Sequence, residues 1–217
     1  MNLDIAKTNM IKQQIRTYDV TDEAVLHLFE HIDRAAFVNP EFQDLAYADM
    51  MLPILCEQVM LSPADQAKML QALQIKPTET VLEIGTGNGF FTALLASLAK
   101  EVISVEVHEE LSMEAEQHLQ RLGIHNVNLQ VGNGANGWKV DAPVDVIVIT
   151  GSLPFLPQNF KNCLQEQGRI LAILGDTPGA MQVSLVTAQG ENHRITPIFE
   201  TDAPQLEKAL QPERFVF

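Results

Sequence analysis

One segment in the middle of the chain restricts the fold more than any other. The run Thr80–Ile84 predicts a β-strand, which leads into the glycine-rich sequence GTGNG (85–89) and then into the helix-compatible stretch FFTALLASLAK. This order is typical of a ligand-binding turn at the carboxyl end of a first parallel strand. Glycine has no Cβ atom, so the backbone there can bend sharply and approach a ligand closely. The segment therefore predicts an α/β fold.

The same alternation continues toward the carboxyl terminus. The β-branched runs EVISVEV, NVNLQV and VDVIVIT are separated by helix-compatible segments, as in a parallel sheet. The continuous apolar run Val144–Thr150 indicates strands covered on both faces. A helix over Pro157–Gln165 and a strand over Arg169–Leu174 extend the pattern, and Gln182–Ala188 and Arg194–Phe199 look like an antiparallel pair joined by a turn. We expect a doubly wound, mostly parallel seven-stranded sheet.

The first third of the chain has a helical pattern instead. Apolar residues recur at a spacing of three to four from Ala6 to Ile15 and again from Val25 to Ile32. Thr21-Asp22-Glu23 offers capping groups for the second helix, and a third helix is expected over Ala64–Leu73. No linker-like composition divides the chain, so we expect one domain over 1–217, with a helical region (1–73) and an α/β core (74–217).

Charge and cysteine content argue against several classes of protein. The chain has 14 basic and 28 acidic side chains, a net charge of -14, which repels nucleic acid and anionic membranes. Cys56 and Cys163 match no zinc-binding spacing, and the six histidines are scattered, so no metal site is predicted. There is no signal-peptide pattern and no apolar run of membrane-spanning length. We expect a cytoplasmic protein, and no pattern specifies an oligomeric state.

The surroundings of the glycine turn favour S-adenosylmethionine as the ligand. Glu83, two residues before Gly85, places a carboxylate where it can face the cationic methionine end of this molecule, whereas the pyrophosphate of NAD would be repelled. The glycines are spaced GxGxG and not GxGxxG, the dinucleotide pattern. The predicted cofactor-binding residues of this turn are Glu83, Gly85, Thr86, Gly87, Asn88 and Gly89.

Two further segments extend the predicted pocket. Glu106, followed by Val107, ends the second strand about 20 residues beyond the turn, where a carboxylate can accept hydrogen bonds from ribose hydroxyls. Gly132-Asn133-Gly134 follows the third strand and would border the adenine ring. An NAD-dependent oxidoreductase would also use Glu106, but no Tyr-x-x-x-Lys or similar hydride-transfer pair is present. A solvated strand end and an ordinary turn are the alternatives for these two segments.

Several motifs together resemble a known family. EIGTGNGF, VISVEV and the segment Leu156–Leu171 resemble class I S-adenosylmethionine-dependent methyltransferases. The upstream pieces RAAFV (34–38), LAYAD (45–49) and LPI (52–54) resemble the lead-in of protein-L-isoaspartate O-methyltransferases. This similarity runs from about Asn9 to Leu174, in order and spacing. It implies methyl transfer to the carboxylate of an isoaspartyl residue in a damaged protein or peptide, with 1–73 on the substrate side.

The resemblance is weakest where the acceptor would bind. The family motif is approximately GQTISQP, whereas this chain has EQVMLSP (57–63), so that Val59 and Leu61 replace hydroxyl residues. Ser62 is one place away and is the candidate for contacting the acceptor, together with Asp49 from the lead-in. The sequence thus predicts a divergent member. The alternative is a cofactor-binding homologue that acts on another acceptor or through protein contacts.

Overall fold

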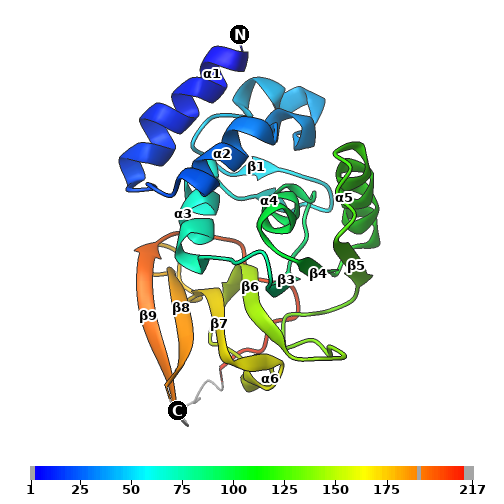
Figure 1. The fold of residues 1–217 in the computed structure, drawn as a ribbon, viewed down its shortest axis with the longest axis vertical. Helices are drawn as coiled ribbons and strands as arrows, with labels where there is room; N and C mark the ends of the chain where they lie inside the picture. Colours follow the sequence, from blue (N-terminus) through cyan, green and yellow to red (C-terminus); the bar gives the residue numbers. More distant parts are fainter. Residues whose placement is uncertain (1–2, 190–191, 213–217) are drawn as a thin grey trace, which may run out of the picture.

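A seven-stranded sheet forms the centre of the computed structural model, which describes residues 3–189 and 192–212 (Figure 1). Its order is β5-β4-β3-β6-β7-β8-β9. The first five strands in this order are parallel to one another, whereas β8 runs antiparallel to β7 and β9 runs antiparallel to β8. The strands are β3 (Thr80–Ile84), β4 (Glu101–Glu106), β5 (Val127–Val131), β6 (Val144–Leu153), β7 (Leu164–Leu174), β8 (Gln182–Gln189) and β9 (Asn192–Glu200). This architecture confirms the predicted mostly parallel seven-stranded sheet.

Six α-helices accompany the sheet in the described part of the chain. They are α1 (Leu3–Asn9), α2 (Glu23–His31), α3 (Pro63–Leu73), α4 (Phe90–Leu98), α5 (Glu109–Arg121) and α6 (Gln158–Asn162). Helix α1 continues into a π-helical turn, Met10–Ile15, whose apolar side chains are buried. The capping prediction for α2 is confirmed, because the Asp22 side chain accepts hydrogen bonds from the backbone N–H groups of Ala24 and Val25.

The two faces of the sheet are covered unequally. Successive residues of a strand point to opposite faces, so Val81 joins the apolar cluster that includes α2 to α5, whereas Leu82 joins a smaller cluster. The smaller cluster is completed by Phe160 of α6, the loop before β6 and Ala209 near the carboxyl end. Because the helices α1 to α3 and the sheet share the larger cluster, apolar packing is continuous across residue 73, as a single domain requires.

A short β-hairpin lies between the helical region and the sheet. Strands β1 (Leu52–Pro53) and β2 (Val59–Met60) pair in antiparallel fashion, which the sequence did not predict. In the turn between them Cys56 and Glu57 have φ angles of 57° and 58°, the left-handed region that favours glycine. Glu57 thus keeps a glycine-like backbone at the position where the family motif has glycine.

Two expectations about the carboxyl-terminal half need correction. The predicted helix Pro157–Gln165 is only five residues long, and β7 already begins at Leu164. Leu164 pairs with Val144 of β6, and the Val144 N–H donates to the Cys163 carbonyl over 2.9 Å, so the sheet imposes an extended backbone there. β8 and β9 form the expected antiparallel pair, but Gly190 and Glu191 of its turn lie outside the described residues.

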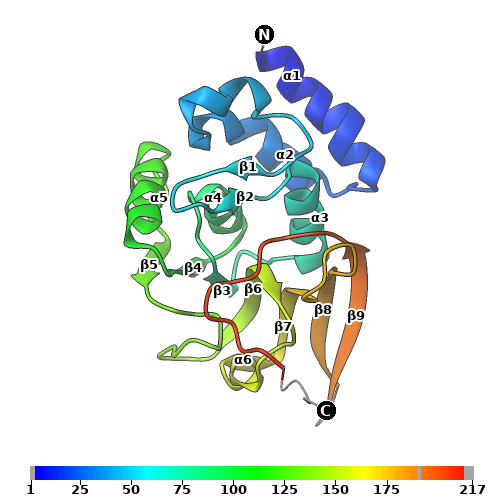
Figure 2. The ribbon, with the colours of Figure 1, turned by 180° about the vertical axis from the view of Figure 1, so that it is seen from behind.

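After β9 the chain returns across the carboxyl ends of the parallel strands. We call residues 201–212 the C-terminal strap (Figure 2). Its backbone pairs with β6: Ser152 N–H donates to Pro204 O over 2.9 Å, and Leu206 N–H donates to Ser152 O over 3.0 Å. These bonds hold the strap against the edge of the sheet where the glycine turn lies.

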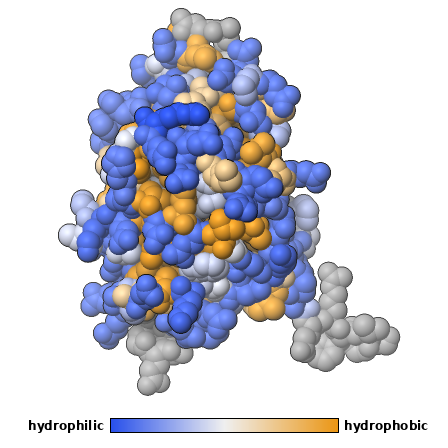
Figure 3. Space-filling model, turned by 90° about the vertical axis from the view of Figure 1, so that its right-hand side faces the viewer, coloured by the Kyte–Doolittle hydropathy of each residue, from blue (hydrophilic) through white to orange (hydrophobic). Residues whose placement is uncertain are grey.

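The molecular surface agrees with the charged composition. On the side nearest α5 and β5, hydrophilic residues dominate and apolar ones form small patches between them (Figure 3). Met113, Leu122 and Val131 are among the exposed apolar side chains. No helix within residues 3–189 and 192–212 is long and apolar enough to cross a bilayer.

Candidate active site

The glycine turn lies tightly against the neighbouring strand β6. Gly85, Gly87 and Gly89 all have positive φ angles, of 96°, 55° and 86°. A Cβ atom on Gly85 would lie 2.3 Å from the Thr150 hydroxyl, which donates to the carbonyls of Ile84 and Gly85. Larger residues are therefore excluded at Gly85 by both space and backbone conformation.

The Glu106 carboxylate accepts a hydrogen bond directly from the backbone of the glycine turn. Its Oε2 accepts from the Gly87 N–H over 2.8 Å, and its Oε1 accepts from the N–H groups of Val107 and His108 over 2.9 and 3.1 Å. The side chain is 5% exposed. Three backbone donors thus orient a carboxylate at the carboxyl end of β4, where ligands bind in open α/β sheets.

Glu83 does not face the cavity, contrary to expectation. Its side chain is fully buried in β3, beneath the turn, where Oε2 accepts hydrogen bonds of 2.6 Å from Thr92 and Ser104. Oε1 has no hydrogen-bond partner. Burial raises the pKa of Glu83 to about 8, although the two hydroxyl donors act in the opposite direction. Because alternate residues of a strand point to opposite sides, Glu83 supports the turn from below.

The other polar residues of the turn have different roles. Thr86 shares a 2.6 Å hydrogen bond with Ser104 and so extends the network around Glu83. Asn88 donates to the Phe37 carbonyl over 2.7 Å, which ties the turn to the helical region. Both line a cavity beside the turn, whereas Gly89 lines none that the structure describes. A Cβ on Gly89 would lie 2.9 Å from that of Ala115, so this glycine permits the close approach of α5.

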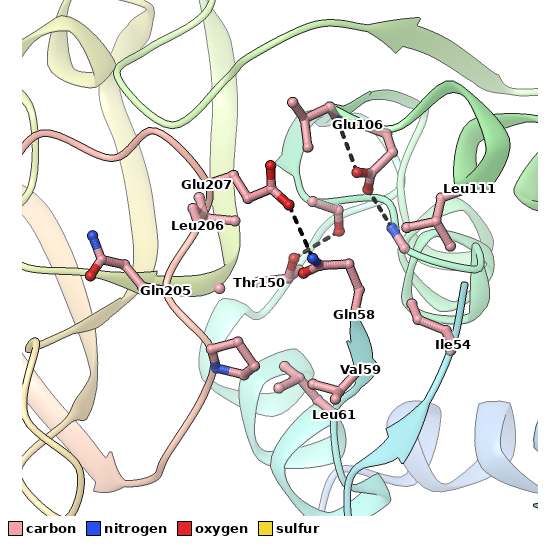
Figure 4. Close-up of a pocket in the computed structure, with 15 residues that line it drawn as sticks. Ile54, Gln58, Val59, Leu61, Glu106, Leu111, Thr150, Gln205, Leu206 and Glu207 are labelled. Carbon is pink, nitrogen blue, oxygen red and sulfur yellow. Dashed lines mark hydrogen bonds between the residues drawn. The ribbon is translucent and has the colours of Figure 1, made fainter. Parts of the chain in front are cut away.

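Three small adjoining cavities follow the carboxyl edge of the sheet. Their volumes are about 80, 40 and 30 Å³, and Gly85 lines all three. The largest is bounded by Gly87 and Glu106 on one side and by the hairpin residues Val59 and Leu61 on the other (Figure 4). Pockets for small molecules usually exceed about 300 Å³. Each of the three is smaller than that, because side chains at this edge divide the space.

The C-terminal strap and the hairpin supply those side chains. Gln58 and Glu207 point toward each other across the cavity, with Gln58 Nε2 donating to Glu207 Oε1 over 3.2 Å (Figure 4). Leu206 lies over Gly151, where a Cβ would come within 2.6 Å of its side chain. Sequence reasoning missed Gln58, Thr150, Leu206 and Glu207, because no local pattern indicates contacts between segments this far apart.

The predicted adenine loop lies at the end of this edge. Val107, Gly132, Asn133 and Gly134 line the third cavity together with Glu106. Asn133 Oδ1 accepts from the Ala135 N–H over 3.0 Å, which fixes the side chain within the loop. A Cβ on Gly132 would lie 2.6 Å from the ring of Trp138, so the indole packs directly on this glycine. The structure thus brings all three predicted loop residues, and Val107, to the cavity.

Neither predicted acceptor residue reaches a described cavity. Ser62 is the N-cap of α3, and its Oγ accepts from the Asp65 N–H over 3.2 Å. Asp49 is exposed on the helical region. Pro63 at the first position of α3 and the extended backbone of Ser62 fix the hydroxyl at the helix end, so the loop does not shift by the one residue that a substrate contact would need.

A buried arginine fixes the hairpin side of the cavity. Arg34, 1% exposed, donates to Ala46 O over 2.9 Å, Leu61 O over 2.7 Å and Gln66 Oε1 over 2.5 Å. Burial lowers the pKa of its guanidinium to about 9. These bonds hold the backbone that places the Leu61 side chain against the cavity, so Arg34 acts on the site by positioning.

Comparisons with known proteins agree on one family. The family model described as protein-L-isoaspartate(D-aspartate) O-methyltransferase matches residues 5–199. A protein-L-isoaspartate O-methyltransferase of Gloeobacter violaceus is 36% identical over 207 residues, which cover 95% of each chain.

Solved structures show the same fold at lower sequence identity. A protein-L-isoaspartate O-methyltransferase superposes with a TM-score of 0.78 at 23% identity, over 92% of this chain and 65% of the other. A Plasmodium falciparum protein of the same description, in complex with S-adenosyl-L-homocysteine, gives 0.79 at 18% identity, over 92% and 97%. With the Rossmann-like methyltransferase fold confirmed and the family model matching most of its length, this chain belongs to the protein-L-isoaspartate(D-aspartate) O-methyltransferase family.

Proposed function

We propose that this chain transfers a methyl group from S-adenosylmethionine to the carboxylate of isoaspartyl residues in damaged proteins or peptides. The observation that carries the proposal is the Glu106 carboxylate, which the Gly87 N–H holds beside the glycine turn over 2.8 Å. A carboxylate so placed accepts hydrogen bonds from two ribose hydroxyls. Membership in the family gives the same reaction.

The residues along the edge suit such a cofactor. Glu106 would hold the ribose, while Gly85 and Gly87 let the backbone approach the methionine part without steric conflict. Asn133, in the loop that lines the third cavity, would border the adenine. Glu83 is fully buried beneath the turn, and a cationic ligand bound above it would favour the ionised form of its carboxyl group. These roles are the ones expected from the sequence, except that Glu83 would act from beneath the turn and not through direct contact with the ligand.

The chemistry demands alignment more than acid or base groups. The bound cofactor supplies an electrophilic methyl group on a sulfonium, and an acceptor carboxylate is already ionised at neutral pH. The chain must then hold one carboxylate oxygen in line with that methyl and exclude water. Ile54, Val59 and Leu61 make one wall of the cavity beside Gly87 and Glu106 apolar, which serves the exclusion of water.

The same wall motivates a second candidate function. Val59 and Leu61 line the cavity at the positions where the family motif has hydroxyl residues, and Ser62 is occupied as a helix cap. An isoaspartyl carboxylate would therefore lack its hydroxyl contacts. The alternative is a chain that binds the cofactor but methylates a less polar acceptor, or acts through protein contacts.

A paired experiment separates the two candidates. Calorimetry with S-adenosylmethionine, and with NAD as the competing ligand, measures cofactor binding; transfer of a labelled methyl group to an isoaspartyl peptide, with the matching aspartyl peptide as control, measures turnover. We expect binding of S-adenosylmethionine and methylation of the isoaspartyl peptide alone. Binding without turnover in the wild type, with turnover gained in Val59→Thr/Leu61→Ser, would favour the second candidate. Binding of NAD alone would contradict both.

The predicted partners rest on the family and on charge. Membership in the family leads us to predict a protein or peptide substrate, and the net charge of -14 leads us to predict no affinity for nucleic acid. A cytoplasmic location stays a prediction, which rests on the two free cysteines, Cys56 and Cys163. Fractionation of cells that express the chain would check it.

A further inference from the structure

Three side chains with different metal-binding groups converge beside the active site. Cys56 lies in the β1–β2 turn, His108 follows β4, and Glu110 is in the first turn of α5. One ligand atom of each, a thiol sulfur, a ring nitrogen and a carboxylate oxygen, lies within 4.8 Å of the other two. Their positions in the sequence form no recognisable ligand spacing, which is why the sequence predicted no metal site.

The three groups match the chemistry of one metal in particular. Zn²⁺ takes cysteine sulfur, histidine nitrogen and carboxylate oxygen at about 2.0 to 2.3 Å in a tetrahedral arrangement, which sets ligand atoms roughly 3 to 4 Å apart. The ligand atoms of the cluster lie within 4.8 Å of one another, which is close to this spacing. Mg²⁺ and Ca²⁺ prefer oxygen ligands alone and do not fit a thiol.

A fourth group completes the surroundings. Glu207 of the C-terminal strap places Oε1 2.8 Å from His108 Nε2 and also accepts from Gln58. Carboxylates in this position commonly orient a metal-bound histidine or serve as a further ligand. A bound metal would thus join the hairpin turn, the start of α5 and the strap at the rim of the cofactor cavity.

The local charge favours a cation. Glu110, Glu106, Glu207 and Glu114 are the charged groups that act on Cys56, and none of them is cationic; together with burial, the larger cause, they raise the pKa of its thiol. A metal ion relieves this repulsion, because it takes the place of the thiol proton and faces the carboxylates with positive charge. The same field disfavours a free thiolate, which argues against a nucleophilic role for Cys56.

The backbone at Cys56 provides a second indication. Its φ of 57° is one that glycine adopts without strain, whereas a cysteine there is strained. A strained residue at a site with converging polar groups is a common sign of a retained role. From the convergence of three ligand types on this turn we propose that Cys56, His108 and Glu110 bind one Zn²⁺ ion.

Metal titration of the whole chain tests the proposal. The purified protein, freed of any affinity tag and treated with a chelator, is titrated calorimetrically with ZnCl₂, and Co²⁺ serves as a spectroscopic probe. We expect one equivalent of Zn²⁺ to bind, and Co²⁺ to give the near-ultraviolet absorption band of a thiolate-bound ion. Cys56→Gly and Glu110→Gln should each weaken Zn²⁺ binding at least about tenfold.

Matched controls exclude trivial explanations. Cys163→Ser removes the other cysteine and Glu109→Gln the neighbouring glutamate, and neither should change Zn²⁺ affinity. Cys56→Gly should unfold at the same temperature as the wild type or higher, because glycine suits the left-handed backbone, so that loss of binding is not loss of fold. Absence of one-to-one binding in the wild type, or equal affinity in Cys56→Gly, would overturn the proposal. Neither result depends on methyl transfer.

Discussion

The two walls of the active-site cavity are built on opposite principles. The glycine-turn wall is polar and made largely of backbone: Glu106 is held by three N–H groups, and Gly85 touches Thr150. The hairpin wall is made of side chains: Val59 and the adjoining Leu61 are apolar, and Gln58 at its rim reaches across to Glu207. Under the proposed function, the first wall would bind the cofactor, whereas the second would face the acceptor.

The turns of the two walls differ in the same sense. The glycine turn uses glycine at each of its positive φ angles, but the hairpin turn places Cys56 and Glu57 there. Non-glycine residues in this conformation cost about 1 kcal/mol each. The glycine turn is thus relaxed and the hairpin turn strained.

The largest effect should come from filling the space at Gly85. In Gly85→Ala the new Cβ would meet the Thr150 hydroxyl at 2.3 Å, so we expect binding of S-adenosylmethionine to fall by about 100-fold or more, that is by about 3 kcal/mol. Gly123→Ala is the matched control, since its φ is also positive, at 67°, but no atom lies within 4 Å of the new methyl group. Calorimetry on both variants measures the difference. Equal affinities would show that the turn does not contact the cofactor.

Removing the charge of Glu106 should have the next largest effect. In Glu106→Gln an amide NH₂ must face a backbone N–H donor, and a charge-assisted acceptor for the ribose is lost, a cost of about 2 kcal/mol or about 30-fold in affinity. Glu101→Gln, at the exposed beginning of the same strand, should leave affinity unchanged. If Glu106→Gln bound the cofactor normally, the polar wall would have been wrongly assigned.

Glu83 should make the stability of the ligand-free protein depend on pH. Its pKa is about 8 in the folded state, against 4.5 for an unperturbed glutamate, so the folded state retains a proton that the unfolded state loses. The contribution of Glu83 to the free energy of unfolding is fully present below about pH 4.5 and is lost as the pH rises to about 8. Over this window the free energy of unfolding of Glu83→Gln should fall less with pH than that of the wild type, because glutamine has no proton to lose.

Denaturant unfolding at several pH values measures this difference. Glutamine imitates the protonated acid, because its carbonyl can accept from Thr92 and Ser104 as Glu83 does. Glu101→Gln again serves as the exposed control and should follow the wild type. If the free energies of unfolding of Glu83→Gln and the wild type changed with pH in the same way, the pKa of Glu83 would not differ between the folded and unfolded states.

Substitution of Ser62 should give the smallest effect, and it distinguishes the capping of α3 from contact with the acceptor. Ser62→Ala removes the cap of α3 and should lower the free energy of unfolding by about 1 kcal/mol, whereas Ser62→Asn, another capping residue, should nearly restore it. Both variants should keep the methyl-transfer rate of the wild type at a temperature where they are folded. Loss of turnover in both, with the fold intact, would return Ser62 to the acceptor site.

Local sequence patterns were sufficient to predict the sheet and the residues of the glycine-turn wall. Period and β-branched content located the parallel strands, and the glycines and Glu106 could be placed at one edge because the carboxyl ends of parallel strands meet there. The extent of α6 was overestimated, since pairing of Leu164 with Val144 is a property of the sheet and not of the segment.

Tertiary structure alone decided what surrounds that wall. The face to which Glu83 points depends on strand register, and the capping role of Ser62 depends on where α3 begins. The strap places Glu207 beside Gln58 and His108, although these residues are about 100 or more positions away in the chain. The sequence determined the elements and the shared ligand site, because those follow from local conformational preference; the acceptor wall and the metal-binding cluster arise from contacts between distant segments, which only the packed chain creates.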